Sequence, residues 1–272
     1  MRSHYEPVTD VDRLMAAFGV TLPDLPEGGK ARGVEPAAFI VAGHGTQTAA
    51  LGELWTGQFG LRSSAAPGDD ASAPARECPV NTMKSNPRFR ESWWAGRRCV
   101  VPVERLTAWC YEAGRPEAWA IQRADGRPLA LAGLWHDGAG PDGERRLSFC
   151  VLTLDATGHA VYGRLRHPLA PEARMPALLP ADVQRRWLHG SLAEAQQLLV
   201  PCPAADLQAA PLAPADTAPP PAWRAEPDLF AEEGWWVAPE THRQKPARPR
   251  TALRPRVMDA PGPVTADLFA GS

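Results

Sequence analysis

Apolar residues recur along this chain with two periods, one typical of helices and one typical of strands. Near the N-terminus, Leu14, Ala17 and Phe18 fall at helical spacing. Thr9 is a residue type that caps helices, and Gly19 is one that ends them. The pattern therefore predicts a helix that starts after Thr9. Before it, the His-Tyr pair at residues 4 and 5 indicates a terminus packed into the fold.

Further helices are expected over three segments: PRFRESWWAG (87–96), PADVQRRWLHG (180–190) and SLAEAQQLL (191–199). Short apolar runs between them predict strands at AAFIVAG (37–43), GELWTGQFGL (52–61), RCVVPVERL (98–106) and LSFCVLTLD (147–155).

Two apolar runs between residues 117 and 137 flank the turn signal Asp125–Gly126, which predicts a β-hairpin. Many short strands with a few short helices favour an α+β fold. We expect its core to be a curved, mostly antiparallel, barrel-like sheet with short helices.

Prolines become frequent where the helix and strand patterns end. The chain holds 30 of them, crowded into segments such as PCPAADLQAAPLAPADTAPPPAW (201–223), which cannot sustain a helix or an interior strand. We expect a globular domain over residues 1–205 and a Pro/Ala-rich C-terminal extension over residues 206–272.

Composition narrows the classes of function. The net charge is −2 and the pI is near 6.4, so no overall positive field indicates nucleic acid, although a local basic patch is compatible with these values. None of the five cysteines forms a C-x-x-C pair, which favours buried thiols over a zinc ribbon or a disulfide framework. No segment approaches the roughly 18 apolar residues of a membrane span, and no signal peptide is evident. We expect a cytoplasmic protein without a membrane partner, metal or cofactor.

The motifs in the middle of the chain follow a specific order. RRCVVPVERL, RADGRPLALAGLW, LSFCVLTLDATGHAVYGRLRHP and RMPALL come in succession, after FGL (59–61) and NPRFRESW (86–93). Together they resemble the SOS response-associated peptidase (SRAP) family, which includes proteins that shield abasic sites in single-stranded DNA. The resemblance covers roughly residues 1–200 and implies an SRAP-like fold and a link to the DNA damage (SOS) response.

The resemblance also implies a reaction at the N-terminus. Such proteins lose the initiator Met and use a second-position Cys, with its own α-amine, to capture the aldehyde of an abasic site as a thiazolidine. An Asn and an Arg of an NAR motif, a Glu after the RC-x-x-P strand and a His before RMP assist. Carboxylate and imidazole groups can move protons, and a guanidinium can hold a phosphate through two hydrogen bonds.

Several of these positions are substituted here. Arg2 stands in place of the Cys, and Ala108 aligns with the catalytic Glu. Met83 replaces the Arg of the NAR motif, and Ser85 replaces the acid that follows it. An α-amine can still form a reversible Schiff base with an aldehyde, but without the thiol it cannot close a thiazolidine ring.

Other positions are kept. Asn81 matches the motif Asn, His167 matches the family His, and Arg174 begins RMP. Asn81 either positions a ligand near the N-terminus or pins a loop. His167 is either a proton shuttle or phosphate contact, or an ordinary hydrogen-bonded residue.

A segment rich in arginine and tryptophan is a candidate for DNA binding. Its guanidinium groups and rings can form a groove with base-stacking platforms, or the rings can be core and the arginines a solvated face. The candidate nucleic-acid-binding residues are Arg88, Arg90, Trp93, Arg97, Arg98 and Arg174.

The C-terminal extension repeats the tripeptide Asp-Leu-Phe. Apolar pairs in such an arm often dock on a partner, and these resemble peptides that bind the bacterial sliding clamp, without the usual leading Gln. Alternatively, each Leu-Phe pair folds back on the domain. The candidate partner-binding residues are Asp228, Leu229, Phe230, Asp267, Leu268 and Phe269.

Three hypotheses follow. The first is an SRAP-like protein that binds single-stranded or abasic-site DNA with a degenerate active site. The second is an active enzyme that cross-links to DNA or processes itself as a peptidase, with Glu104 or Glu112 as its acid. The third is a scaffold that acts through the Asp-Leu-Phe segments.

Overall fold

The computed structural model describes residues 4–21, 36–43, 50–62, 74–111, 116–139, 143–165 and 172–212. Its strands are β1 (His4–Pro7), β2 (Pro36–Val41), β3 (Glu53–Phe59), β4 (Glu77–Pro79), β5 (Arg98–Cys110), β6 (Glu117–Arg123), β7 (Leu129–Ala139), β8 (Arg145–Asp155), β9 (Arg174–Pro176) and β10 (Leu207–Pro211). Its helices are α1 (Val11–Phe18), α2 (Pro87–Trp94), α3 (Ala181–His189) and α4 (Leu192–Gln197), with 3-10 turns η2 (Tyr162–Leu165) and η3 (Ala204–Asp206).

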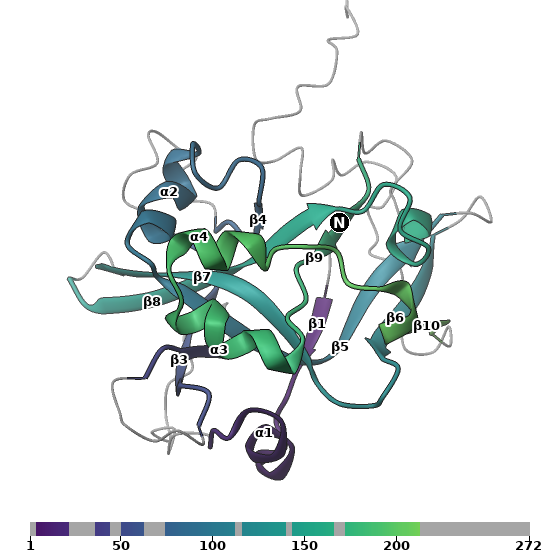
Figure 1. Cartoon of the computed structure of the whole chain (residues 1–272), viewed down its shortest axis with the longest axis horizontal. Helices are drawn as coiled ribbons and strands as arrows, with labels where there is room; N and C mark the ends of the chain where they lie inside the picture. Colours follow the sequence, from purple (N-terminus) through teal and green to yellow (C-terminus); the bar gives the residue numbers. More distant parts are fainter. Residues whose placement is uncertain are drawn as a thin grey trace, which may run out of the picture. The chain divides into compact units, whose positions relative to one another are not determined.

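Five of the strands close into a barrel, and they can be followed in Figure 1. Strand β5 pairs with β2 and β7, β2 pairs with β3, β3 pairs with β8, and β8 pairs with β7. The β3–β8 pair is parallel, and the other four pairs of the ring are antiparallel. The predicted α+β class with a barrel-like, mostly antiparallel sheet is confirmed.

Successive side chains of β5 point alternately into the barrel and toward helix α3. The guanidinium of Arg98 lies 5.8 Å from the ring of Trp187 on α3, so Arg98 faces the helix. Its neighbour Cys99 therefore points inward, where it faces Gly133 of β7. A Cβ at Gly133 would lie 2.8 Å from Cys99 Sγ and 2.6 Å from the carbonyl oxygen of Cys150. Close packing inside the barrel requires glycine at this position.

Aromatic rings fill much of the barrel interior. Phe39 and Phe149 are fully buried, with ring centroids 4.8 Å apart. Phe59 packs against Phe149 at 5.5 Å, while Trp55 packs against Trp135 at 5.3 Å. Phe39 joins the two groups through an edge contact with Trp55. These contacts join the five rings into one continuous aromatic cluster.

The hairpin predicted around Asp125–Gly126 is wrong. Strands β6 and β7 both pair with β5 along the same edge, β6 with residues 106–110 and β7 with residues 98–103. Because β5 is 13 residues long, it has room for both strands. The turn therefore joins two strands that continue in one direction.

The N-cap of the first helix lies one residue later than expected. Asp10, rather than Thr9, is the N-cap, and its carboxylate accepts hydrogen bonds from the backbone N–H groups of Asp12 and Arg13. Gly19 ends the helix with a φ of 67°, as predicted.

The sheet continues beyond residue 205. Strand β10 pairs with β6 along its whole length, from Leu207 opposite Arg123 to Pro211 opposite Trp119. Because Pro211 is the last residue of this strand, its missing N–H interrupts no ladder. The expected domain end near residue 205 thus falls just before the last described strand.

Candidate functional site

The N-terminal strand lies directly against β5. His4 pairs with Thr107 and Tyr5 with Leu106, and the next residue of β5 is Ala108. Ala108 is 1% exposed. The start of the chain thus adjoins the position where the resemblance implies a catalytic carboxylate, and that position holds a methyl group.

A small cavity, here called the N-terminal pocket, lies where β1 pairs with β5. Its volume is about 20 Å³, room for roughly one water molecule. It is lined by Tyr5, Phe59, Glu77, Leu106, Leu131, Val151, Thr153 and Pro176. These residues come from seven of the ten strands, so the pocket depends on most of the sheet.

Two hydroxyl groups and a carboxyl group give the pocket its polar character. Tyr5 OH and Thr153 Oγ1 are buried and have no hydrogen-bond partner within the described part of the chain. Burial raises the pKa of Tyr5 well above its ordinary value, and the nearby Cys99 thiol adds to the shift, while Arg76 opposes it. The phenol is therefore neutral at physiological pH.

Sequence reasoning missed Glu77 as a residue of this site. The segment before it has the composition of a loop, and nothing local indicates that β4 pairs in parallel with β8. That pairing places Glu77 opposite Val151, another residue of the pocket. Next to it, the guanidinium of Arg76 lies 5.8 Å from the ring centroid of Phe59. A cation and an aromatic ring thus lie at the rim of the pocket.

The NAR-like segment forms a turn after β4. Asn81 is exposed there, and Met83 is fully buried in the core. The backbone N–H groups of Thr82 and Met83 both donate to the carbonyl of Pro79, which closes the turn. Ser85 Oγ lies 3.2 Å from the carbonyl of Thr82. Because Met83 is core, the turn supplies no guanidinium where the resemblance implies a phosphate contact.

The proposed alternative acid Glu104 lies in an ion pair. Its carboxylate accepts two hydrogen bonds from Arg13 of α1, at 2.8 and 2.9 Å. Glu104 is not among the residues that line the N-terminal pocket. Arg2, Glu112, His167 and the two Asp-Leu-Phe segments lie outside the described residues.

The residues predicted to bind nucleic acid do not form one groove. Trp93 is fully buried, while its neighbour Trp94 is 60% exposed. Arg98 is 6% exposed, and its guanidinium donates to the carbonyls of Leu188 and Gly190 at the end of α3. The buried Trp93 ring is core rather than a base-stacking platform, and the Arg98 guanidinium caps a helix.

The remaining predicted arginines have different surroundings. The Arg174 guanidinium is 4% exposed and paired with Glu172 at 2.9 Å. Arg97 pairs with Glu91 at 3.2 Å. Arg88 is half-buried and Arg90 is exposed on α2. Of the six predicted residues, Arg90 offers the most accessible cation.

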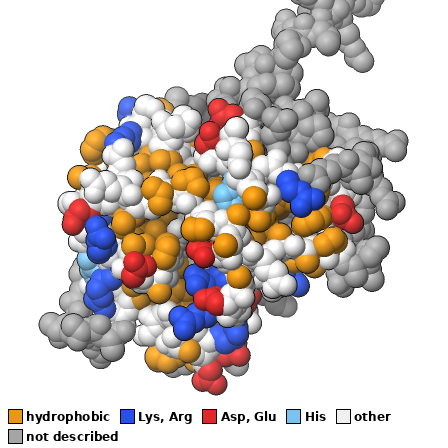
Figure 2. All heavy atoms as spheres, turned by 45° about the vertical axis from the view of Figure 1, so that its right-hand side comes forward, with side chains coloured by type: hydrophobic (Ala, Val, Ile, Leu, Met, Phe, Trp, Pro, Cys, Tyr) orange, Lys and Arg blue, Asp and Glu red, His pale blue; other side chains and the backbone are white. Residues whose placement is uncertain are grey.

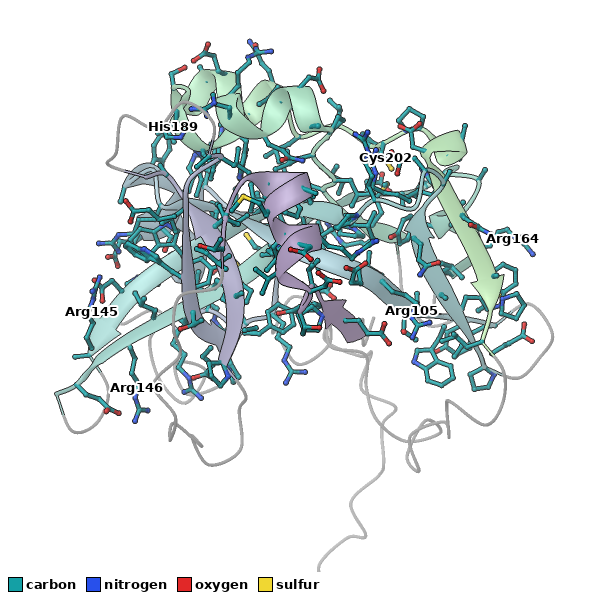
Figure 3. All side chains as sticks on the ribbon, turned by 90° about the horizontal axis from the view of Figure 1, so that it is seen from below. Arg105, Arg145, Arg146, Arg164, His189 and Cys202 are labelled. Atoms are coloured by element: carbon teal, nitrogen blue, oxygen red, sulfur yellow. The ribbon has the colours of Figure 1, made fainter. Side chains whose placement is uncertain are left out.

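Positive charge is dispersed over the described surface. Figure 2 shows basic and acidic side chains interspersed on the face that it presents. In Figure 3, Arg145 and Arg146 lie toward one side of the barrel, and Arg105 and Arg164 lie toward the other. Several surface arginines are paired with carboxylates, including Arg145 with Asp137 and Arg146 with Glu144. This pairing weakens any local positive field.

All five cysteines of the chain are buried and unbridged. Burial, and to a lesser degree the neighbouring Cys150, raises the pKa of Cys99 well above its ordinary value. Burial also raises the pKa of Cys202, to about 11. The thiols of Cys99 and Cys202 are therefore protonated and poorly reactive at neutral pH.

The described residues contain neither a cluster suited to a metal ion nor a helix suited to a membrane. No cluster of three or more His, Cys, Asp or Glu side chains is placed there to hold a metal ion. No helix in the same ranges has the length and apolar character to cross a membrane.

Solved structures support the fold assignment. A protein from Bordetella bronchiseptica is 25% identical, covers 78% of this chain and 99% of its own, and has a TM-score of 0.67. A protein from Bacteroides thetaiotaomicron is 21% identical with a TM-score of 0.56, and it covers 66% of this chain and 75% of its own. A phage-related protein from B. bronchiseptica is 18% identical with a TM-score of 0.52, and it covers 77% of this chain and 93% of its own.

No curated protein matches the chain. The family model described as SOS response associated peptidase (SRAP) matches residues 12–215, which is most of the sequence. The chain therefore belongs to the SRAP family, a family associated with the SOS response to DNA damage.

Proposed function

We propose that this protein binds single-stranded DNA at the N-terminal pocket, prefers abasic sites, and forms no covalent link to them. One observation carries the proposal. The pairing of β1 with β5 places Tyr5 at the pocket, while Ala108 supplies a methyl group in place of the expected acid. The scaffold of the family site is kept, and its chemistry is lost.

The state of the cysteines supports non-covalent binding. Thiazolidine formation needs a thiolate next to an α-amine, and the second residue of this chain is Arg2. Every cysteine is buried within the fold. None of them is available as a substitute nucleophile.

Arg76 supports DNA as the ligand. Its guanidinium lies over the ring of Phe59, which lines the pocket, and suits attraction of a backbone phosphate. Arg76 is exposed and accessible to such a ligand.

Two measurements on the full chain test the proposal. Abasic single-stranded DNA is incubated with the wild type and with an Arg2→Cys, Ala108→Glu double variant, and denaturing gels report covalent adducts. We expect the wild type to yield none. A wild-type adduct formed in a yield similar to that of the double variant would show that the site is still active.

Equilibrium binding provides the second measurement. We expect Arg76→Ala to weaken single-stranded DNA binding and to reduce the slope of log affinity against log salt by about 0.7. Arg186→Ala removes an equally exposed arginine from α3 and serves as the matched control. Equal affinities of the two variants would count against binding at the pocket.

A further inference from the structure

A second cavity, here called the α3 pocket, lies between helix α3 and the start of β3. Its volume is about 220 Å³, against about 20 Å³ for the N-terminal pocket. It is lined by Gly43, residues 50–53, Arg185 and His189. None of these residues lines the N-terminal pocket, and in Figure 3 His189 lies apart from Arg105, which pairs with Glu6 of β1. The two cavities are therefore separate sites.

Helix α3 contributes a guanidinium group and an imidazole ring to this pocket. Arg185 and His189 are four residues apart, so they lie on the same face of the helix. The Arg185 guanidinium donates to the carbonyl of Ala50 at 2.7 Å. His189 Nε2 lies 3.4 Å from the carbonyl oxygen of Leu51. These contacts hold α3 against the segment before β3 and fix the guanidinium at the wall of the pocket.

Glu53 contributes the opposite charge. Its Oε2 accepts a hydrogen bond from Trp55 Nε1 at 3.3 Å, which orients the carboxylate. A Cβ at Gly43 would lie 3.4 Å from Glu53 Cγ and 3.6 Å from Oε1. Glycine at this position therefore leaves a space beside the carboxylate that any other side chain would fill.

A pocket that carries both charges disfavours ligands with a single charge. Arg185 attracts an anion that Glu53 repels, and Glu53 attracts a cation that Arg185 repels. A ligand with a carboxylate and an ammonium group satisfies both residues, and a guanidinium can hold a carboxylate through two hydrogen bonds. The volume is below the roughly 300–1,000 Å³ of pockets for drug-sized ligands, so the pocket suits a molecule of few heavy atoms.

We propose that the α3 pocket binds a free α-amino acid, with its carboxylate on Arg185 and its ammonium group beside Glu53. The amino acid places these two groups on one carbon atom, which matches a small pocket with charges of both signs. The space beside Gly43 admits the ammonium group to the carboxylate of Glu53. This binding is independent of DNA binding at the N-terminal pocket.

Saturation-transfer NMR on the full chain tests the proposal with three small ligands. L-alanine carries both charged groups, propionate lacks the ammonium group, and ethylammonium lacks the carboxylate. The three molecules otherwise share the same short carbon chain. We expect L-alanine to bind about tenfold more tightly than either of the others, since each of them loses one hydrogen-bonded charge.

Charge-removing variants identify which residue holds which group. Arg185→Gln should bind L-alanine and ethylammonium equally, because the guanidinium that attracts the carboxylate is gone. Glu53→Gln should bind L-alanine and propionate equally, and its amide oxygen can still accept the hydrogen bond from Trp55. Arg186→Gln is the matched control, because Arg186 is an exposed neighbour on α3 that does not line the pocket. The control should keep both preferences of the wild type.

Gly43→Ala tests the geometry without changing a charge. The added methyl group would make ordinary contacts with Glu53, so the variant should melt at the wild-type temperature. We expect it to bind L-alanine about tenfold more weakly, because the methyl group occupies the space beside the carboxylate.

The outcomes decide the proposal without reference to DNA. Absence of L-alanine binding by the wild type, or equal binding of all three ligands, would overturn it. Preferences that survive both Arg185→Gln and Glu53→Gln would also overturn it, as would an equal loss in Arg186→Gln. In each case, binding of single-stranded DNA would remain a separate question for the N-terminal pocket.

Discussion

Tyr5 meets Phe59 edge-on, with ring centroids 4.9 Å apart and ring planes at 86°. The contact joins the N-terminal strand to the barrel wall, because Phe59 also packs against Phe149 of the aromatic core. Since both rings line the N-terminal pocket, the pocket is complete only when β1 is in place.

Two substitutions of Tyr5 should separate the contribution of its ring to stability from the contribution of its hydroxyl. We expect Tyr5→Ala to lower the free energy of unfolding by about 2 kcal/mol, because it removes a partly buried aromatic ring. Tyr5→Phe should leave stability unchanged or raise it, since the lost hydroxyl has no partner in the described residues. Urea unfolding measures both. A large loss in Tyr5→Phe would instead indicate that the Tyr5 hydroxyl forms a hydrogen bond in the folded protein.

Gly133→Ala should destabilise the barrel. The added Cβ would approach a backbone oxygen to 2.6 Å and Cys99 Sγ to 2.8 Å. Backbone on one side leaves little room to relax, so we expect a loss of about 2 kcal/mol in urea unfolding. Gly138→Ala on the same strand is the control, since its nearest contact would be a His136 ring atom at 3.3 Å. Equal losses would contradict the packing argument.

Neighbouring arginines should differ in their effect on stability. Arg98→Ala removes hydrogen bonds to two carbonyls at the end of α3 and a cation–π contact with Trp187. We expect a loss of about 2 kcal/mol. Arg97→Ala removes a partly exposed ion pair with Glu91, a cation–π contact with Trp135 and a hydrogen bond to His136. We expect a loss of about 1 kcal/mol, less than for Arg98, because the Arg97 guanidinium is not buried. Thermal unfolding of both variants is the test, and the reverse order would refute it.

His136 should make stability depend on pH. Arg97 donates to its Nδ1 over 3.3 Å, so that nitrogen is unprotonated in the fold. Burial lowers the pKa of His136 below its ordinary 6.5, and the charge of Arg97 adds to this, while Glu91 and Asp137 oppose it. Because the folded pKa lies below the unfolded one, this stability is present above pH 6.5 and is lost as pH falls through the lowered pKa.

Melting curves at successive pH values measure this effect. We expect the melting temperature of the wild type to fall between pH 6.5 and about pH 5, and that of His136→Gln to fall less. Parallel curves for the two proteins would exclude His136 as the titrating group. The interval stays above the range in which ordinary carboxylates dominate acid unfolding.

Most of the helices and strands can be predicted from local sequence patterns. Helix α1 ends at Gly19 because glycine takes the left-handed conformation readily, and that preference is visible in sequence. The N-cap of this helix is harder to predict, because Thr9 and Asp10 are both good capping residues. Which of them caps the helix depends on where the backbone leaves the extended conformation. The failure around Asp125–Gly126 has a different cause. A turn signal in the sequence predicts only a local bend. It does not show that β6 and β7 each pair with β5, which is long enough to hold both.

The candidate site could be predicted in part. The family motifs placed Ala108 and the N-terminal strand in one region, and the pairing of β1 with β5 agrees with this. The role of Glu77 was not visible, because it arises from a parallel pairing with a strand that is distant in sequence. Trp93 and Trp94 illustrate the same limit: adjacent identical residues differ in burial because a helix turns only one of them inward.

The pairing of β1 with β5 also sets an order of events during synthesis. Glu6 and Arg105, which form an ion pair between these strands, lie 99 residues apart in the chain. At typical translation rates of about 5–20 residues per second, the first strand waits roughly 5–20 s before its partner leaves the ribosome. The segment that completes the pocket is therefore made first and docks late, and the nascent chain is without the complete pocket during that interval.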